Sequence, residues 1–470
     1  MRVLLMTPPY IPGYMRNARW DGMGASGSQW YPIYLAYCTG LLEKEGHEAR
    51  LLDAQVDRLT HEETYRQVQD FSPSLTVIYH SMKSLDNDMK VAEQVRTLTD
   101  SEIVLVGHSS SMHGPEMLDK SPYVGMIARG EFDFTVLDIA NQVPRDEVKG
   151  LVWKDSSGAI HINPPREPVT GEQLDTLPFV TDVYRRHLNL RNYSQSCHRY
   201  PFVDLFTGRG CAWGLCSFCL WPNTLNRGAR YRTRTISNVT DELRFVREEM
   251  PFVKEVYFQD DVLPGDRARE LSEAILSANL KVCWSAYSRA NLNLDTMKLM
   301  KRAGCRLLEV GFESCNKEVL KNIKKGVTVK QMERFAQDAQ DAGLLVIGAF
   351  ITGLPGETVE SVKATTAWAR KLPLLRYTIT LPKPYPGTPL YQSLETDGHL
   401  TDGRPDYPDL TTDDIYRWNK WSVRHVFLSW DYFFRIARRP SQWASVLRAA
   451  KYFMPYVTSR EDQGVKDMEW

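Results

Sequence analysis

Short apolar runs alternate with helix-patterned segments through residues 1–145. Each run has the length of a strand, and single helical patterns such as Tyr31–Lys44 lie between successive runs. Strands separated by single helices predict a parallel, doubly wound sheet, in which ligands bind beyond the carboxyl ends of the strands. The predicted strands are Val3–Met6, Ala49–Leu52, Leu75–Tyr79, Ile103–Val106 and Val124–Ala128.

A second alternating series begins at Phe202. Its clearest helix is Val329–Ala342, where Thr328 and Gln331 form a capping box and Gly343 ends the pattern. The six strand–helix units predict a partial β/α barrel with its active face at the carboxyl ends of the strands. The predicted strands are Phe202–Phe206, Val256–Phe258, Val282–Ala286, Leu307–Val310, Leu345–Ile351 and Tyr377–Leu381.

Two stretches fall outside these series. Residues 150–165 have the pattern of a β-hairpin, and residues 164–200, rich in Pro, Arg and Asn, are expected to connect two domains. Residues 415–457 are strongly aromatic with interspersed basic side chains, which predicts helices. We expect these aromatics to pack on the barrel as a cap; the alternatives are a lid over a large hydrophobic substrate and a surface that contacts a membrane.

Charge and composition restrict the class of protein. Lysine plus arginine and aspartate plus glutamate both number 58, so there is no basic excess to indicate a nucleic-acid partner. No apolar run has membrane-spanning length, so no transmembrane helix is expected. Five of the eight cysteines are scattered singly, which indicates buried thiols and a cytoplasmic protein rather than a disulfide framework.

The other three cysteines, Cys211, Cys216 and Cys219, lie within one short glycine-containing loop after the first barrel strand. Three thiolates so close in sequence can bind one metal centre. No fourth cysteine or histidine follows at ligand distance, whereas a structural zinc site uses four protein ligands. An iron–sulfur cubane held by three thiolates instead keeps one iron open for a substrate or cofactor.

This loop resembles the cluster motif of the radical S-adenosylmethionine (SAM) superfamily, and three later strand ends agree: Tyr257–Asp261, Val310–Ser314 and Gly348–Glu357. One departure is the spacer of four residues, rather than three, before Cys216, and we expect Gly214 to absorb the extra residue. The resemblance implies a [4Fe-4S] cluster on Cys211, Cys216 and Cys219, and SAM contacts from Asp260, Arg289, Glu313, Ser314, Gly353 and Pro355. The alternative role for Glu313 is to cap the next helix.

The first series resembles the cobalamin-binding domain that precedes many radical SAM cores. The matching pieces are Tyr31–Ala36, Gly46–Glu48, Leu52–Ala54, Gly107–His108 and Arg129–Glu131. The resemblance implies cobalamin contacts from Pro8, Ser81, Gly107, His108 and Glu131, and the absence of an Asp-x-His-x-x-Gly motif implies no histidine below the cobalt. The alternative is a Rossmann-like domain that binds nothing.

The resemblance therefore implies an α/β protein: an N-terminal Rossmann-like cobalamin-binding domain, a partial (β/α)6 radical SAM barrel and a helical C-terminal region. The expected boundaries are 1–148 for the cobalamin domain, 149–200 for the hairpin and linker, 201–392 for the barrel and 393–470 for the helical domain.

The implied activity is that of a cobalamin-dependent radical SAM methyltransferase, which methylates an unactivated carbon through a 5′-deoxyadenosyl radical and methylcobalamin. Its substrate is expected to be a small or lipid-like molecule, and its electron donor a flavodoxin or ferredoxin. A related alternative is a cyclase or ring-rearranging enzyme acting on a tetrapyrrole or polyprenoid. A non-catalytic cobalamin or iron–sulfur sensor and a zinc-stabilised scaffold are the alternatives from other classes. The sequence identifies no catalytic residue.

Overall fold

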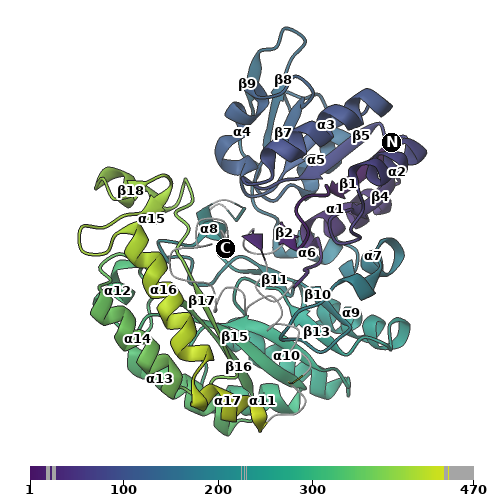
Figure 1. Cartoon of the computed structure of the whole chain (residues 1–470). Coiled ribbons are helices and arrows are strands. Elements are labelled where there is room, and N and C mark those ends of the chain that lie inside the picture. Colours follow the sequence, from purple (N-terminus) through teal and green to yellow (C-terminus); the bar gives the residue numbers. More distant parts are fainter. Residues whose placement is uncertain are drawn as a thin grey trace.

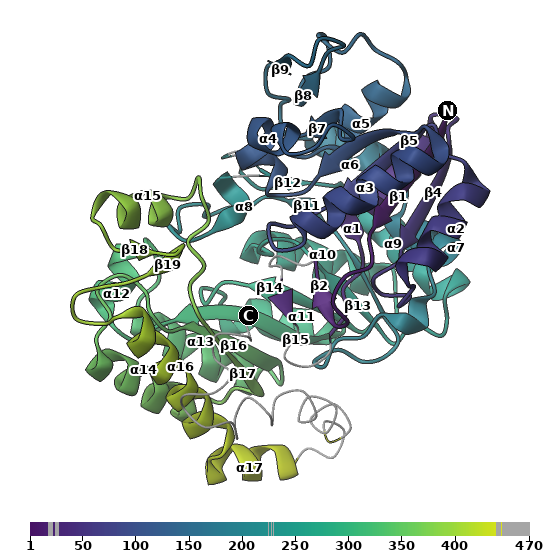
Figure 2. The same cartoon turned by 45° about the horizontal axis from the view of Figure 1, so that its top comes forward.

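The computed structural model describes residues 1–16, 22–23, 28–223, 225–226, 228, 230–438 and 443 of the 470. Figure 1 shows a first sheet with its helices, in purple and blue, above a second sheet, in teal and green. In Figures 1 and 2 the yellow-green helices α16 (Thr412–Phe427) and α17 (Trp430–Ala437) run along the outside of the second sheet. The predicted α/β class with a helical C-terminal part is confirmed.

The first sheet has seven strands in the order β4-β1-β5-β6-β7-β8-β9. The first five strands in this order are parallel, and their bounds are β4 Glu48–Asp53, β1 Arg2–Thr7, β5 Leu75–Tyr79, β6 Glu102–Val106 and β7 Met126–Ala128. The predicted hairpin is present as β8 (Leu151–Lys154) and β9 (Ile160–Ile162), and it extends this sheet with antiparallel pairing. The expected boundary at residue 148 therefore falls between two paired strands of one sheet.

Helices cover both faces of the first sheet. Buried residues of α1 (Ile33–Lys44) and α5 (Asp133–Ala140) belong to a core that continues into the second sheet. Those of α2 (His61–Phe71), α3 (Leu85–Thr99) and α4 (Ser110–Asp119) form a separate core on the opposite face. The α1 face is therefore the one that joins the two sheets.

The second sheet has six parallel strands in chain order, from β10 to β17, as a partial barrel requires. The bounds are β10 Phe202–Leu205, β13 Glu255–Phe258, β14 Trp284–Ser288, β15 Cys305–Glu313, β16 Leu345–Ile351 and β17 Arg376–Thr380. The connecting helices include α9 Ile236–Glu249, α10 Gly265–Ser277, α11 Leu294–Arg302, α13 Val329–Asp341 and α14 Val359–Lys371. The capping box predicted for α13 is present, and Gly343 follows that helix with φ +74°.

The segment expected to connect the domains carries helices that its sequence did not indicate. They are α6 (Gly171–Thr176) and α7 (Val180–His187), followed by a single 3-10 turn at Leu190–Asn192. With six and eight residues, α6 and α7 are too short to display a helical period. The prediction for residues 415–457 is confirmed as helical through α17, whereas residues 439–457, apart from 443, lie outside the described part of the chain.

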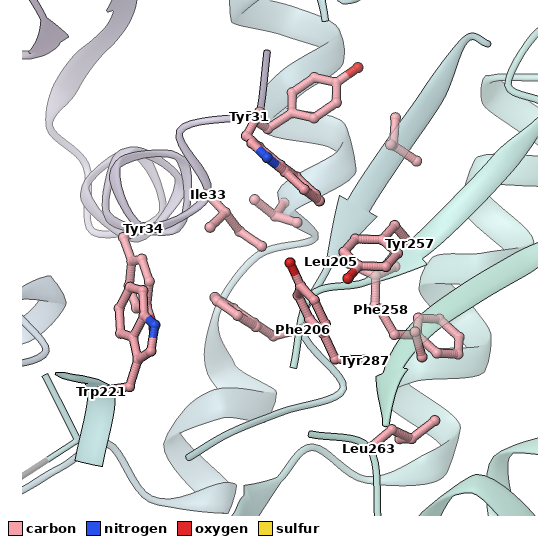
Figure 3. Packing of buried hydrophobic residues seen from close by; sticks show 14 of the residues in the cluster. Tyr31, Ile33, Tyr34, Leu205, Phe206, Trp221, Tyr257, Phe258, Leu263 and Tyr287 are labelled. Atoms are coloured by element: carbon pink, nitrogen blue, oxygen red, sulfur yellow. The ribbon is translucent and has the colours of Figure 1, made fainter. Parts of the chain in front are cut away.

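An aromatic layer joins the two sheets. The ring of Tyr31 stacks between Tyr184 and Tyr193, with ring centroids 4.3 and 4.1 Å apart, and its hydroxyl donates to the carbonyl of Phe202 (2.8 Å). Figure 3 shows the helix α1 side chains facing those of the barrel, and Tyr34 stacks on Trp221. Because these rings are fully or almost fully buried, separating the sheets would expose a large apolar area.

Two ion pairs cross the same interface, one fully buried and one partly buried. Arg209 donates two hydrogen bonds to the carboxylate of Asp133 (2.7 and 3.1 Å), and neither side chain is more than 1% exposed. Arg232 forms a second two-bond pair with Glu131 (2.7 and 2.8 Å). Arg209 directly precedes the glycine and first cysteine of the three-cysteine loop. The first domain is thus attached where that loop begins.

A third group of buried charges lies near the amino ends of the barrel strands. The two ring nitrogens of His198 lie 3.4 Å from a carboxylate oxygen of Glu255 and 3.5 Å from one of Glu309. Burial alone lowers the pKa of His198, but these carboxylates outweigh burial and raise the pKa to about 8. Arg306 also donates to Glu255, so the carboxylate keeps a second cationic partner.

We predict that replacing Asp133 with Asn lowers the free energy of unfolding by about 3 kcal/mol or more, because the change removes the charge that is hydrogen-bonded to the buried Arg209. Urea denaturation of the purified protein measures this difference. The matched control is Asp241→Asn, which breaks the exposed pair with Arg244 and is expected to cost about 1 kcal/mol or less. Equal losses in the two variants would contradict the role assigned to the buried pair.

The pair of His198 with its carboxylates predicts a specific dependence of stability on pH. The folded pKa of about 8 lies above the unfolded value of about 6.5, so the stabilisation is complete below pH 6.5 and disappears as the pH rises through 8. The free energy of unfolding is measured with urea at pH 6 and at pH 9. Its decrease between these two pH values should be about 2 kcal/mol smaller in His198→Gln than in the unaltered protein. An identical pH dependence in both proteins would contradict this assignment.

Candidate active site

The three-cysteine loop lies between two short paired strands, β11 (Gly208–Arg209) and β12 (Arg232–Thr233). Within it Gly214 has φ +65°, a left-handed backbone that residues other than glycine adopt at a cost. The N–H of Gly214 also points to the sulfur of Cys211, 3.4 Å away. Gly214, the glycine expected to absorb the extra residue of the spacer, therefore turns the chain back toward the first cysteine.

Each of the three thiols is half-buried. In the described part of the chain, no three Cys, His, Asp or Glu side chains lie close enough to hold a metal ion, so these thiols are not gathered at ligand distance. Burial raises the pKa of the Cys216 thiol, whereas the charges of Lys325 and Arg289 lower it. Three soft sulfur donors on one loop, with cationic groups beside them, fit an iron–sulfur cluster in ligand type.

Arg289 lies at this loop, as the resemblance implied. Its guanidinium carbon is 4.7 Å from the centre of the Trp213 ring, and its Nη2 donates to the carbonyl of Lys325 (2.7 Å). Trp213 belongs to the four-residue spacer between Cys211 and Cys216. The arginine after the third barrel strand and the cysteine loop after the first are therefore in direct contact.

Glu313 ends strand β15 beside the same group. Its carboxylate accepts from the ammonium of Lys325 (2.7 Å), both side chains are buried, and Glu313 has φ +66°. A left-handed residue other than glycine costs roughly 1–3 kcal/mol and is typical of functional sites. The alternative that Glu313 caps the next helix is wrong, because Asn316 caps α12 (Lys317–Asn322).

The remaining barrel residues implied by the resemblance have partners within the barrel. Asp260 accepts from the backbone N–H of Thr207 (2.6 Å) and from the hydroxyls of Thr207 and Tyr231, so it holds the end of β10 in place. The Ser314 hydroxyl contacts that of Thr365 (3.2 Å). In the loop after β16, the Gly353 N–H donates to Glu357 (2.6 Å) and the Pro355 carbonyl accepts from Asn322 (3.0 Å).

The first-domain residues implied by the resemblance follow the carboxyl ends of strands β1, β5, β6 and β7. The Pro8 carbonyl accepts from Arg16, and the hydroxyl of Ser81 contacts that of Tyr14 (2.9 Å). Gly107 has φ +132°, and a Cβ atom at this position would lie 2.8 Å from the carbonyl oxygen of His80.

The last two of these residues contact the barrel. The ring of His108 lies edge-on to Tyr385, 6.1 Å between centres, and both carboxylate oxygens of Glu131 bond to Arg232. Tyr385 follows β17 and Arg232 forms β12, so both barrel partners belong to loops at its carboxyl face. The carboxyl ends of the first sheet therefore face the loops that carry the cysteines.

Several residues of this site were not identified from the sequence. Lys325 lies in a polar stretch without a recognisable pattern, Asp133 starts an otherwise ordinary helix, and Arg209, although it directly precedes the cysteine motif, carries no sign of its distant partner. Only Trp213 carried a signal, because it stands inside the cysteine motif at the position of the irregular spacing.

Residues 205–369 match the model of the radical SAM superfamily. An uncharacterized methyltransferase of Pyrococcus horikoshii is 29% identical over 401 residues, which span 83% of each chain. The cytidylyl-2-hydroxyethylphosphonate methyltransferase of Streptomyces wedmorensis is 25% identical, over 73% of each chain. The anaerobic magnesium-protoporphyrin IX monomethyl ester cyclase of Rubrivivax gelatinosus is 23% identical, over 84% of this chain and 70% of the cyclase.

The fold also matches a solved structure, the radical SAM methyltransferase TsrM of Kitasatospora setae with cobalamin and a [4Fe-4S] cluster bound. The TM-score is 0.67 at 20% identity, covering 86% of this chain and 79% of TsrM. At this identity the likeness concerns the fold. Together with the match to the family model, it shows that residues 205–369 carry the predicted radical SAM domain and that the chain as a whole has the fold of TsrM.

Proposed function

We propose that the protein is a cobalamin-dependent radical SAM methyltransferase that methylates an unactivated carbon of its substrate. The observation that carries this proposal is the arrangement of the two sheets. The carboxyl ends of the first sheet, including His108 and Glu131, face the carboxyl-end loops of the barrel. Two parallel sheets that direct their ligand-binding edges at one another suit two cofactors acting on one substrate. The methyltransferase relatives cover most of the chain and support the same activity.

Cys211, Cys216 and Cys219 would hold a [4Fe-4S] cluster, and with three protein ligands this cluster would leave one position for SAM. When bound, the cluster supplies the electron that cleaves SAM, and cobalamin supplies a carrier for the transferred methyl group. Arg289 directs its guanidinium to the SAM carboxylate, a planar group suited to two parallel hydrogen bonds. Glu313, oriented by Lys325, and Ser314 bind the amino-acid and ribose part of SAM, while the Gly353–Pro355 loop borders its adenine.

The first domain, residues 1–148 with the attached hairpin, holds cobalamin beyond the ends of its strands. Pro8, Ser81, Gly107 and His108 border this site. Glu131 has both oxygens on Arg232 and also accepts from the N–H of Val169 (2.7 Å), so its part is to fix the two domains rather than to contact cobalamin directly. Asp260 likewise acts by positioning the end of β10.

A cyclase acting on a large ring system is the second candidate, because the anaerobic cyclase of Rubrivivax gelatinosus aligns over 84% of this chain. Both candidates use the same cofactors and differ in what happens to the substrate radical. A small or lipid-like substrate, an external one-electron donor such as flavodoxin or ferredoxin, and a cytoplasmic location complete the proposal.

The C-terminal helices support two of the three roles considered for the aromatic region, the cap and the membrane contact. Phe427 and Tyr432 pack against Tyr377 of the barrel, as a cap does. On α17, however, Trp430, Phe433 and Phe434 are more than half exposed. No helix of the described residues is long and apolar enough to cross a bilayer. We therefore include a peripheral membrane contact through these three side chains in the proposal.

Anaerobic, reduced protein is expected to convert SAM to 5′-deoxyadenosine, and Cys216→Ala or Cys219→Ala should abolish both the cluster absorbance and this cleavage. Cys283→Ala, which changes a half-buried thiol outside the loop, is the matched control and should retain both. Chromatography of the nucleoside products measures the outcome. Undiminished cleavage by Cys216→Ala would refute the cluster assignment.

The products also separate the two candidates. Methyl transfer forms S-adenosylhomocysteine together with 5′-deoxyadenosine when an acceptor substrate is present. Cyclisation of magnesium-protoporphyrin IX monomethyl ester, supplied as the probe, would give 5′-deoxyadenosine without S-adenosylhomocysteine and would favour the second candidate.

The membrane contact predicts co-sedimentation with vesicles of phosphatidylcholine and phosphatidylserine. Replacing Trp430, Phe433 and Phe434 with Ser should reduce the bound fraction several-fold, because each exposed aromatic ring contributes apolar area to the lipid interface. The control is Phe252→Ser, another exposed aromatic on the barrel, which should bind as the unaltered protein does. Equal binding by all three proteins would contradict the contact.

A further inference from the structure

The turn after helix α12 connects three parts of the candidate site. Its first three carbonyls, at Ile323, Lys324 and Lys325, accept from Ser217 N–H (3.1 Å), Trp213 Nε1 (2.9 Å) and Arg289 Nη2 (2.7 Å), respectively. These three carbonyls follow the last residue of α12, Asn322, so their donors have to come from outside the helix. Here the cysteine loop supplies two of the missing donors and the arginine supplies the third.

The indole ring of Trp213 packs against this turn at Gly326. At Gly326, a Cβ atom would lie 2.1 Å from the nearest ring carbon of Trp213, so only glycine allows this contact, and the φ of +68° favours glycine as well. The guanidinium carbon of Arg289 lies over the same ring, 4.7 Å from its centre. A cation over a tryptophan face is stabilised by roughly 0.5–2 kcal/mol, depending on how far water is excluded.

The same turn also reaches strand β15. The ammonium of Lys325 pairs with Glu313, and its charge acts on the thiol of Cys216. The backbone of the turn thus holds the cysteine loop and Arg289, while one of its side chains holds Glu313. All three belong to different strand–helix units of the barrel.

We propose that Trp213 is a positioning residue, and that the four-residue spacer exists in this chain to place its indole on the turn 323–326. This contact fixes the position of the cysteine loop relative to Arg289. Retention of the cluster and binding of SAM therefore depend on each other. The inference rests on the proposed function in one respect: it takes Arg289 and the three cysteines as the SAM and cluster ligands.

The variants are Trp213→Ala, Trp213→Phe, Arg289→Lys, the double variant Trp213→Ala/Arg289→Lys, and Gly326→Ala, whose Cβ would overlap the indole. Leu215→Ala is the matched control, since Leu215 lies in the same spacer but is 59% exposed. Three quantities are measured without turnover: hydrogen exchange of the peptide around Ser217 in cluster-free protein, iron and sulfide per chain, and binding of radiolabelled SAM to unreduced protein by equilibrium dialysis.

In cluster-free protein, Trp213→Ala and Gly326→Ala should speed exchange around Ser217 about tenfold, the size of one lost hydrogen bond, whereas Leu215→Ala should not change it. In loaded protein, Trp213→Ala should weaken SAM binding about tenfold or lose iron, and Trp213→Phe, which keeps the ring without the N–H, should fall between it and the unaltered protein. The double variant should bind SAM no more weakly than the weaker single variant, because the two residues act as a unit.

Unchanged exchange, iron content and SAM affinity in Trp213→Ala would overturn the proposal, as would multiplicative effects in the double variant. Failure of the unaltered protein to bind iron or SAM would instead contradict the proposed function. Even then, hydrogen exchange in the cluster-free protein still tests whether Trp213 stabilises the turn.

Discussion

The buried pair between Arg209 and Asp133 is the constraint on which the rest of the structure depends. Each charge loses its hydration in the interface and has the other as its direct hydrogen-bonded partner, so any sliding between the domains would break a buried ion pair. The aromatic rings of Tyr34, Tyr37 and Phe206 surround the guanidinium at 5.1–5.4 Å, which excludes water and strengthens this requirement. Because Arg209 lies two residues before Cys211, the position of the cysteine loop is set by the first domain as well as by the barrel.

This arrangement explains how two separate sheets can serve one reaction. Radical chemistry requires the substrate to be held in a fixed orientation, and small displacements of the reacting atoms cost rate. The core that continues from α1 into the barrel, together with the pairs Arg209–Asp133 and Arg232–Glu131, makes the two domains one unit. Within the barrel, the turn 323–326 likewise holds separate parts together, because it contacts the cysteine loop, Arg289 and Glu313.

Local patterns predicted the elements well, and long-range polar pairs were not predictable. Strands Leu75–Tyr79 and Leu345–Ile351 were predicted to the residue, because apolar runs bounded by turn residues depend only on neighbours in sequence. The cysteine spacing and the strand-end motifs predicted a candidate site, and Arg289 does lie against the cysteine loop in the structure. The partners Asp133 and Arg209 are 76 residues apart, and nothing in either neighbourhood indicates the other. Helix α7 was not predictable either, because it packs against α1 and β10 and so depends on contacts that its own sequence does not show.

The most direct test of the account is the metal content of anaerobically reconstituted protein. Iron, acid-labile sulfide and cobalt are measured on the same sample after removal of unbound cofactor. The account predicts about four irons and four sulfides with one cobalt per chain, as one [4Fe-4S] cluster and one cobalamin require. Zinc bound at the cysteines in place of iron and sulfide, or a chain that retains no cobalt, would contradict it.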